Sequence, residues 1–147
     1  MSQEVTERIP LKPVVSVSRE ATVFEAVKAM VARNVGAAVV LEGEKLVGVV
    51  TERDVSRRVV LAGLDPKQTP VAEVMTKQVL TVREDADRTS ALQLMAKHHI
   101  RHLPVVDAAG RVKTMLSMRH LLRAEVLDLQ QTVWELVGDT AIDGPGG

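Results

Sequence analysis

The stretch Leu46–Val55 reads LVGVVTERDV and joins an expected strand to an expected helix. Its first part, Leu46–Thr51, is mainly apolar and β-branched, which is typical of a strand buried on both faces. A helix is expected to follow over residues 52–62. Thr51 and Asp54 therefore lie at the first turn of this helix, where backbone N–H groups have no partner within the helix.

Thr51 and Asp54 together fit a nucleoside phosphate. Backbone N–H groups at a helix start and a threonine hydroxyl suit a phosphate group. A carboxylate beside them can accept two hydrogen bonds from a ribose diol, whereas it would repel a bare anion. In a purely structural interpretation, Thr51 caps the helix and Asp54 interacts favourably with its N-terminus. This stretch alone leaves both interpretations open.

The sequence around this stretch is the first copy of an internal repeat. A shift of 65 residues places Val17–Glu42 over Val82–Asp107, with identical residues at five of the aligned positions. One extra residue at Ala108 changes the shift to 66 and aligns the T-x-x-D pair with Ser117 and His120. Two copies of this length predict a paired module rather than a solenoid.

Each repeat has the pattern β-α-β-β-α. In the first, Thr22 and Glu25 form a T-x-x-E capping box, and Asn34 is suited to end the helix. In the first repeat, strands are expected over 14–17, 37–41 and 46–51, with one helix that begins at residue 22 and another over 52–62. In the second repeat, strands are expected over 79–82, 103–107 and 112–117, with helices over 87–98 and 118–137. Neither half is large enough to bury a good core alone. The predicted fold class is therefore α/β, with two β-α-β-β-α repeats packed with pseudo-two-fold symmetry and an extended C-terminal helix.

The boundaries follow from these elements. The expected parts are a first repeat (13–63), a linker with a short helix (64–78), a second repeat (79–123), a C-terminal helix extension (124–140) and a disordered tail (141–147).

Composition narrows the class of function. The chain has no cysteine, 19 Lys and Arg against 19 Asp and Glu, and only Phe24 and Trp134 as aromatic residues. Balanced charge gives no attraction to a phosphate backbone, and two distant rings make no base-stacking surface, so nucleic acid is not an expected partner. The apolar runs are too short to span a bilayer, and residues 1–10 do not resemble a signal peptide. No membrane association and a cytoplasmic location are expected.

The residues resemble those of a known family, the cystathionine β-synthase (CBS) domain pair, also called a Bateman module. Leu46–Val55 is similar to the family signature G-h-h-[T/S]-x-x-D-h, in which h is apolar, at each specified position. Val74–Thr76, before the second repeat, and His102–Asp107, in its central strand, add to the likeness. The resemblance covers residues 13–123 and implies a ligand in the cleft between the two repeats.

In such modules the T-x-x-D residues of one repeat face the starts of the first and central strands of the other. Carried over by position, the implied ligand-binding residues are Val49, Thr51, Arg53, Asp54, Lys77, Gln78, Val79, Ile100, Arg101, His102 and Pro104. The apolar members are expected to hold the base, and Arg53, Arg101 and His102 to face phosphates together with the nearby lysine. Taken singly, Arg53 also fits a solvated helix face, and Arg101 with His102 a surface turn.

The second copy of the signature departs from the family pattern. It has Thr114 where the family prefers glycine and His120 where it prefers aspartate. A neutral imidazole has one acceptor nitrogen, so a ribose diol loses its two-oxygen acceptor. The residues expected around this opposite cleft are Val14, Val35, Gly36, Ala37, Ser117 and His120. This cleft is expected to be empty, to take a different ligand or to serve only packing. One good site, not two, is therefore predicted.

Other site chemistry finds little support in the sequence. His98 and His102 are four residues apart, but Ile100–Leu103 are expected to leave the helix, which removes a metal-ligating spacing. No nucleophile elbow or Gly-rich phosphate loop is present. The chain is therefore expected not to be an enzyme and to hold no metal or resident cofactor.

Two functions follow. The first is a stand-alone regulatory module that binds an adenine nucleotide (AMP, ADP or ATP) or S-adenosylmethionine and signals to an unknown regulated protein. The second is a structural dimerisation or interaction module with vestigial nucleotide sites. A homodimer is expected. The final helix carries an apolar stripe that either covers an edge of the module or mediates dimerisation or partner binding: Leu122, Val126, Leu129, Val133, Leu136, Val137, with Trp134.

Overall fold

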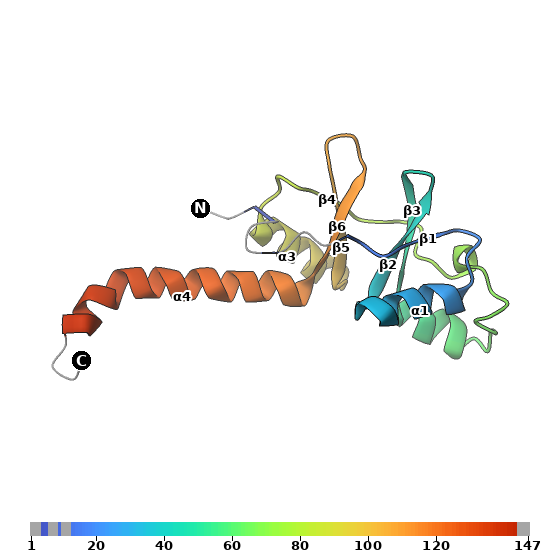
Figure 1. Cartoon of the computed structure of the whole chain (residues 1–147), viewed down its shortest axis with the longest axis horizontal. Helices are drawn as coiled ribbons and strands as arrows, with labels where there is room; N and C mark the ends of the chain where they lie inside the picture. Colours follow the sequence, from blue (N-terminus) through green and yellow to red (C-terminus); the bar gives the residue numbers. More distant parts are fainter. Residues whose placement is uncertain (1–3, 6–8, 10–12, 144–147) are drawn as a thin grey trace.

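The computed structural model describes residues 4–5, 9 and 13–143, with the side chains of this part up to Gly138. The first repeat contains β1 (Ser16–Ser18), α1 (Val23–Arg33), β2 (Ala37–Glu42), β3 (Lys45–Thr51) and α2 (Glu52–Val55). The second contains β4 (Val82–Arg83), α3 (Arg88–His98), β5 (His102–Val106), β6 (Val112–Ser117) and α4 (Met118–Asp143). The predicted α/β class and the doubled β-α-β-β-α order are confirmed. Figure 1 shows the repeats next to each other, with α4 extending away from both.

Each repeat forms one three-stranded sheet within the described part of the chain. β1 lies parallel to β2, which pairs antiparallel with β3, and β4, β5 and β6 pair in the same way. The hairpins turn at Gly43 (φ 63°) and Gly110 (φ 85°), a backbone conformation that glycine adopts without steric cost. Both hairpin ends lie on the same side of the molecule (Figure 1).

The helix ends follow the sequence signals. Thr22 Oγ1 accepts a hydrogen bond from the Glu25 N–H at 3.1 Å, and the Thr22 N–H donates to Glu25 Oε2 at 3.2 Å, so the predicted capping box is confirmed. Asn34 ends α1 and His99 ends α3, both in the left-handed conformation, with φ of 53° and 54°. Because these residues occupy equivalent positions, the two repeats are alike in backbone conformation as well as in sequence.

The N-terminal segment and the linker are exchanged between the repeats. Val5 is fully buried and packs with Ile9 in the core of the second repeat, while Val71, Val74 and Met75 pack in the core of the first. The exchange is symmetric, because the N–H of Val5 donates to the Ala86 carbonyl and the N–H of Val71 donates to the Ala21 carbonyl, both at 2.7 Å. The segment 64–78, expected as a linker, thus supplies part of the first repeat's core.

A third apolar cluster joins the repeats. Ala37, Val39 and Val49 of the first sheet are buried, and the partly buried Val79 and Met115 of the second repeat belong to the same cluster. This contact holds the carboxyl end of β3 next to the second repeat.

Some elements differ in extent from the sequence expectation. The helix expected over 52–62 is α-helical only to Val55 and continues as a π-helical turn, η1 (Ser56–Val60). In this turn Arg58 Nη1 donates to the carbonyls of Val74 and Met75, each at 3.0 Å, which ties the turn to the linker. The linker helix is a 3₁₀ turn, η2 (Val71–Glu73). The first strand of each repeat is shorter than expected.

The final helix is longer than expected. α4 ends at Asp143 instead of near 137, so residues 141–143, expected in a disordered tail, are helical. The reason is that no glycine or proline occurs between Gly138 and Gly144 to end the helix. Residues 144–147 of that expected tail lie outside the described residues.

Candidate functional site

A cleft of about 440 Å³ lies between the two repeats. Its lining includes every residue that the family resemblance assigned to the ligand except Lys77. The first repeat supplies the end of β3 and the start of α2, and the second supplies the turn between α3 and β5. A cleft of this volume falls within the range of small-molecule sites, roughly 300–1,000 Å³.

Thr51 and Asp54 form a reciprocal capping box at the start of α2. Thr51 Oγ1 accepts a hydrogen bond from the Asp54 N–H at 3.1 Å, and Asp54 Oδ2 accepts one from the Thr51 N–H at 3.0 Å. The Thr76 hydroxyl donates to Asp54 Oδ1 at 3.1 Å. Asp54 is 8 % exposed. The structural interpretation of this pair is therefore realised, and since a carboxylate has about four acceptor positions, a ligand hydroxyl can still be accepted.

Arg53 links the repeats along the edge of the cleft. Its Nη1 donates a hydrogen bond to the carbonyl oxygen of His99 at 2.8 Å. Because His99 ends α3, this bond ties the first turn of α2 to the end of α3. A guanidinium has five N–H donors, so Arg53 keeps donors for an anionic ligand.

The cleft also contains residues that sequence reasoning did not assign to it: Gly36, Glu52, Arg57, Arg58, Thr76, Leu80, His98 and His99. Arg57 lies one helical turn after Arg53, and this spacing could have indicated it. His98 and His99 directly precede Ile100, and their place beside an assigned residue is the signal that could have found them. The cleft therefore has a larger positively charged and imidazole-bearing surface than predicted.

His102 lies between acidic and basic groups at the cleft. Burial lowers the pKa of His102 below its ordinary value of 6.5. The nearby Glu52 carboxylate opposes this shift, whereas the interactions with Arg101, His120 and Arg53 add to it. His102 is therefore neutral at pH 7 and acts there as a hydrogen-bonding group rather than as a cation.

The profile of the CBS domain matches the chain twice, over residues 5–61 and 71–127. The chain belongs to the CBS domain family. A mitochondrial CBS domain-containing protein of Arabidopsis thaliana is 37 % identical over 120 residues, which make up 78 % of this chain and 58 % of the relative. The chain thus spans little more than half the length of that protein.

Solved CBS structures have the same fold. A CBS domain protein from Pyrobaculum aerophilum complexed with AMP has a TM-score of 0.77 and 30 % identity, covering 88 % of this chain and 99 % of that chain. The CBS domain pair of the protein MJ0100 in complex with 5′-methylthioadenosine and S-adenosyl-L-methionine has a TM-score of 0.76 and 25 % identity, covering 87 % of this chain and 99 % of that chain.

The CBS boundaries agree with the exchanged segments of the fold. The two matched regions begin at Val5 and Val71, the residues that pack on the opposite repeat. Each CBS repeat therefore begins with a segment that completes the core of the other, which explains why the two form one unit.

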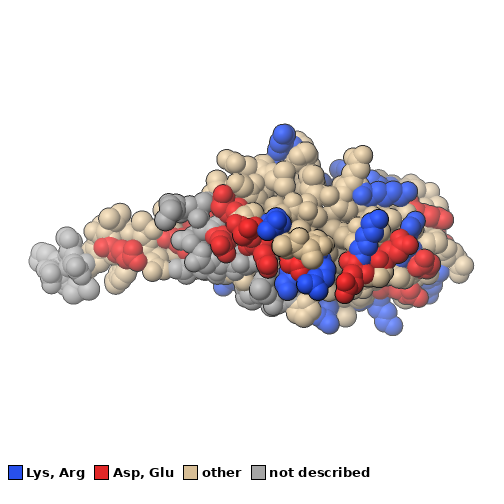
Figure 2. Space-filling view, turned by 90° about the horizontal axis from the view of Figure 1, so that it is seen from above, with Lys and Arg blue, Asp and Glu red and all other residues tan. Residues whose placement is uncertain are grey.

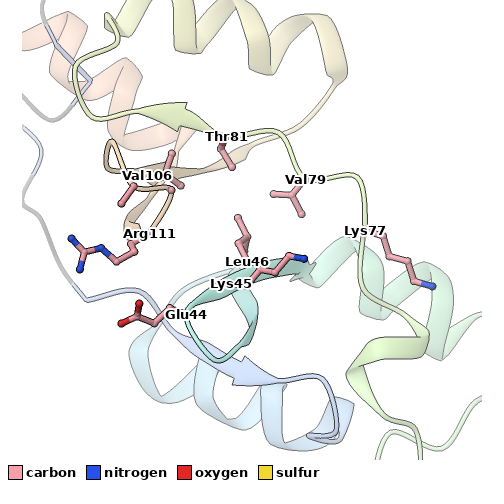
Figure 3. Close-up of a pocket in the computed structure, with 10 residues that line it drawn as sticks. Glu44, Lys45, Leu46, Lys77, Val79, Thr81, Val106 and Arg111 are labelled. Carbon is pink, nitrogen blue, oxygen red and sulfur yellow. The ribbon is translucent and has the colours of Figure 1, made fainter.

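The structure places Lys77 outside the cleft of this CBS pair. Thr76 pairs with Val49 through a β-bridge, and successive side chains of an extended segment point to opposite sides. Thr76 and Gln78 therefore point into the cleft, and Lys77 lines a separate pocket of about 550 Å³ at the hairpin ends. Figure 3 shows Lys77 and Arg111 pointing away from each other in this pocket, so its cations do not converge on one point.

A second cleft, of about 390 Å³, shares a wall with the first. Of the residues expected there, Val35, Gly36 and Ser117 line it, whereas Val14, Ala37 and His120 do not. Ala37 and Val14 pack instead in the cluster between the repeats. Ser117 Oγ accepts a hydrogen bond from the His120 N–H at 3.2 Å, so Ser117 caps α4 as Thr51 caps α2.

Metal clusters and membrane spans are both absent from the described residues. Within 4–5, 9 and 13–143, no three acidic or histidine side chains come together as a metal site. In that same part of the CBS pair, no helix combines the length and apolar character needed to cross a bilayer.

Proposed function

We propose that this CBS pair is a regulatory module that binds an adenosine ligand between its repeats and signals its occupancy to a partner protein. The observation that carries the proposal is the cleft itself, which joins the Thr51 and Asp54 pair of one repeat to Ile100–His102 of the other. A ligand that contacts both repeats favours one arrangement of them over others, which is the requirement for a regulatory response.

The cleft offers a distinct group for each part of an adenine nucleotide. The Asp54 carboxylate can accept hydrogen bonds from the ribose hydroxyls. Val49, Ile100 and Pro104 provide apolar contacts for the base. Arg101 and Arg57 lie in the same cleft and suit phosphate oxygens. This set of cations favours AMP, ADP or ATP over S-adenosylmethionine, whose sulfonium carries a positive charge.

Two relatives support the ligand class. The Pyrobaculum protein is described as complexed with AMP, and the MJ0100 pair with 5′-methylthioadenosine and S-adenosyl-L-methionine. All three ligands contain an adenosine group. Binding of such a group by this chain, its cytoplasmic location and its role in regulating a partner protein are parts of the proposal.

Thermal unfolding with a panel of AMP, ADP, ATP, GTP and S-adenosylmethionine tests the ligand. We expect adenine nucleotides to raise the melting temperature, because a ligand at 100 times its dissociation constant stabilises the folded state by about 2.7 kcal/mol. Arg101→Ala should weaken binding measured by calorimetry, whereas Lys77→Ala, which removes a cation outside the cleft, should leave it unchanged. The absence of any shift across the panel would contradict the proposal.

A second function is favoured by the other cleft. His120 replaces the acceptor aspartate and does not line that cleft, so a structural interaction module with vestigial sites is the competing explanation. This explanation predicts that the chain binds no member of the panel and that its self-association is the same with and without these ligands.

A further inference from the structure

One face of α4 is apolar and exposed. Eight large apolar side chains on this helix are at least 39 % exposed: Leu122, Val126, Leu127, Leu129, Val133, Trp134, Leu136 and Val137. Figure 1 shows that most of the helix extends beyond both repeats, so neither sheet covers this face. The interpretation that the stripe covers an edge of the module is therefore wrong.

The opposite face of α4 is fixed to the second repeat. Leu121 and Ala124 are buried in its core. Arg88 of α3, whose side chain is 1 % exposed, forms ion pairs with Glu125 and Asp128 of α4. These contacts hold the base of the helix, so the apolar face is presented by a rigidly attached element.

The exposed stripe has the spacing of a coiled-coil seam. Val126 and Val133 occupy a positions, while Leu122, Leu129 and Leu136 occupy d positions of one heptad frame. In parallel coiled coils, valine at a with leucine at d favours two strands, so the seam suits a helix pair whose orientation is set by other features. The helix has 26 residues and is about 39 Å long, which is sufficient for a helix pair.

The charge along α4 favours an antiparallel pair. Arg119 and Arg123 are the last basic residues of the chain, and both lie near the base of the helix. Figure 2 shows acidic residues among uncharged ones, without Lys or Arg, on the visible face of its outer part. An antiparallel pair brings the basic base of one helix to the acidic outer part of the other and opposes their macrodipoles, whereas a parallel pair places like charges together.

The uncharged middle of the helix fits a two-fold axis. A two-fold axis places residues beside their own copies, and Leu129–Trp134 contains no charged residue. With the axis near Gln131, Leu129 of one copy lies against Val133 of the other.

We propose that α4 is an interaction surface for a second copy of this chain, and that the two helices pair antiparallel with Leu129 of each copy against Val133 of the other. The proposal is independent of the ligand cleft.

Sedimentation velocity tests the surface. The full chain should sediment with the mass of an assembly of two or more copies, and Leu129→Lys should halve that mass by weakening self-association at least roughly 100-fold. Leu61→Lys is the matched control, because Leu61 is 81 % exposed on a different face. Since Leu129 is exposed in the single chain, the variant should keep the wild-type fold and lose only the stability that association adds. A monomeric wild type, or an unchanged mass for Leu129→Lys, overturns the proposal.

Mixing two variants tests the antiparallel register. Leu129→Lys and Val133→Glu should each fail to self-associate, but together they should form a heterodimer. The antiparallel pair places the introduced lysine of one variant against the introduced glutamate of the other, and it keeps the second Leu129–Val133 contact intact. In a parallel pair each residue lies beside its own copy, so the introduced lysine and the introduced glutamate would not face each other. No heterodimer in the mixture overturns the arrangement.

Introduced cysteines give an independent readout, since the chain has none of its own. Gln130→Cys lies beside the proposed axis and should form an intermolecular disulfide. Leu136→Cys should not, because the two copies of this residue are about 15 Å apart along the antiparallel pair. Rapid cross-linking at Leu136 but not at Gln130 indicates a parallel pair and overturns the proposal.

Discussion

The hydroxyl of Thr76 donates a hydrogen bond to the carboxylate of Asp54, with 3.1 Å between the oxygens. Thr76 belongs to the segment that leads into the second repeat, and Asp54 belongs to the first turn of α2. The same carboxylate accepts the Thr51 N–H and faces the cleft. One side chain thus holds the linker, begins a helix and offers an acceptor to a ligand, so its structural and binding roles must be separated by experiment.

Thr76→Val and Asp54→Asn separate these roles. Thr76→Val removes one donor from the carboxylate and should lower the unfolding free energy by about 1 kcal/mol while changing nucleotide affinity less than about threefold. Asp54→Asn should cost about 2 kcal/mol and weaken nucleotide binding at least roughly tenfold, because the amide offers one acceptor oxygen instead of two. Urea unfolding and calorimetry measure the two quantities. Equal losses of affinity in both variants would contradict a direct role for Asp54.

Gly48→Ala should destabilise the first repeat. A Cβ at this position would lie 2.4 Å from Met75 Sδ and 3.1 Å from the Thr76 carbonyl oxygen, so the methionine must move and the backbone contact stays tight. We expect a loss of about 1–3 kcal/mol in urea unfolding. In the double variant with Met75→Ala, the loss should be smaller than the sum of the single losses, because the smaller side chain relieves the clash. Strict additivity would contradict this explanation.

The parts of the fold that depend on neighbouring residues could be predicted from sequence. The Thr22 capping box and the strand Val112–Ser117 were both identified from local patterns, and the T-x-x-D pair located one side of the cleft. The remaining features depend on contacts between distant segments. Val5 and Ile9 lie in a polar stretch without periodicity, so their burial in the second repeat had no local signal.

Two charged residues illustrate the same limit. The orientation of Lys77 is set by the bridge between Thr76 and Val49, a pairing that the linker sequence does not reveal. Arg88 follows the helix cap Asp87 and would ordinarily be assigned to a solvated face. Its burial depends on two acidic residues of α4 that lie far along the chain.

The stability of the chain should fall as the pH drops below 7, in part because of His102. The pKa of His102 is lowered in the folded state by burial, so the unfolded chain, with an ordinary pKa near 6.5, takes up the proton first. Stability is therefore lost as pH falls through 6.5 and stops falling from this cause below the folded pKa. His102→Gln should reduce the slope of unfolding free energy against pH in this window.

A bound nucleotide should oppose this dependence. Phosphates near His102 favour its charged form and raise its pKa, so nucleotide binding should take up protons and become tighter as pH falls through the same window. Calorimetry in buffers of different ionisation enthalpy measures the proton uptake. An uptake that is unchanged in His102→Gln would assign the effect to another group.

The ion pairs of Arg88 predict an asymmetric response to substitution. Arg88 has a side-chain exposure of 1 %, whereas its partners Glu125 and Asp128 are 39 % and 23 % exposed. Removing both acids with Glu125→Gln and Asp128→Asn takes these two carboxylates away from a buried cation and should cost about 3–5 kcal/mol. Arg88→Met removes the buried charge instead and leaves two partly exposed carboxylates, so it should cost less.

Urea unfolding of both proteins and of the triple variant measures this asymmetry. In the triple variant, Arg88→Met should restore most of the stability lost with the two acids, because no buried charge then remains. A smaller loss for the two acidic substitutions than for Arg88→Met would show that α4 is held mainly by Leu121 and Ala124. The orientation of the helix would then depend on apolar packing rather than on the buried guanidinium.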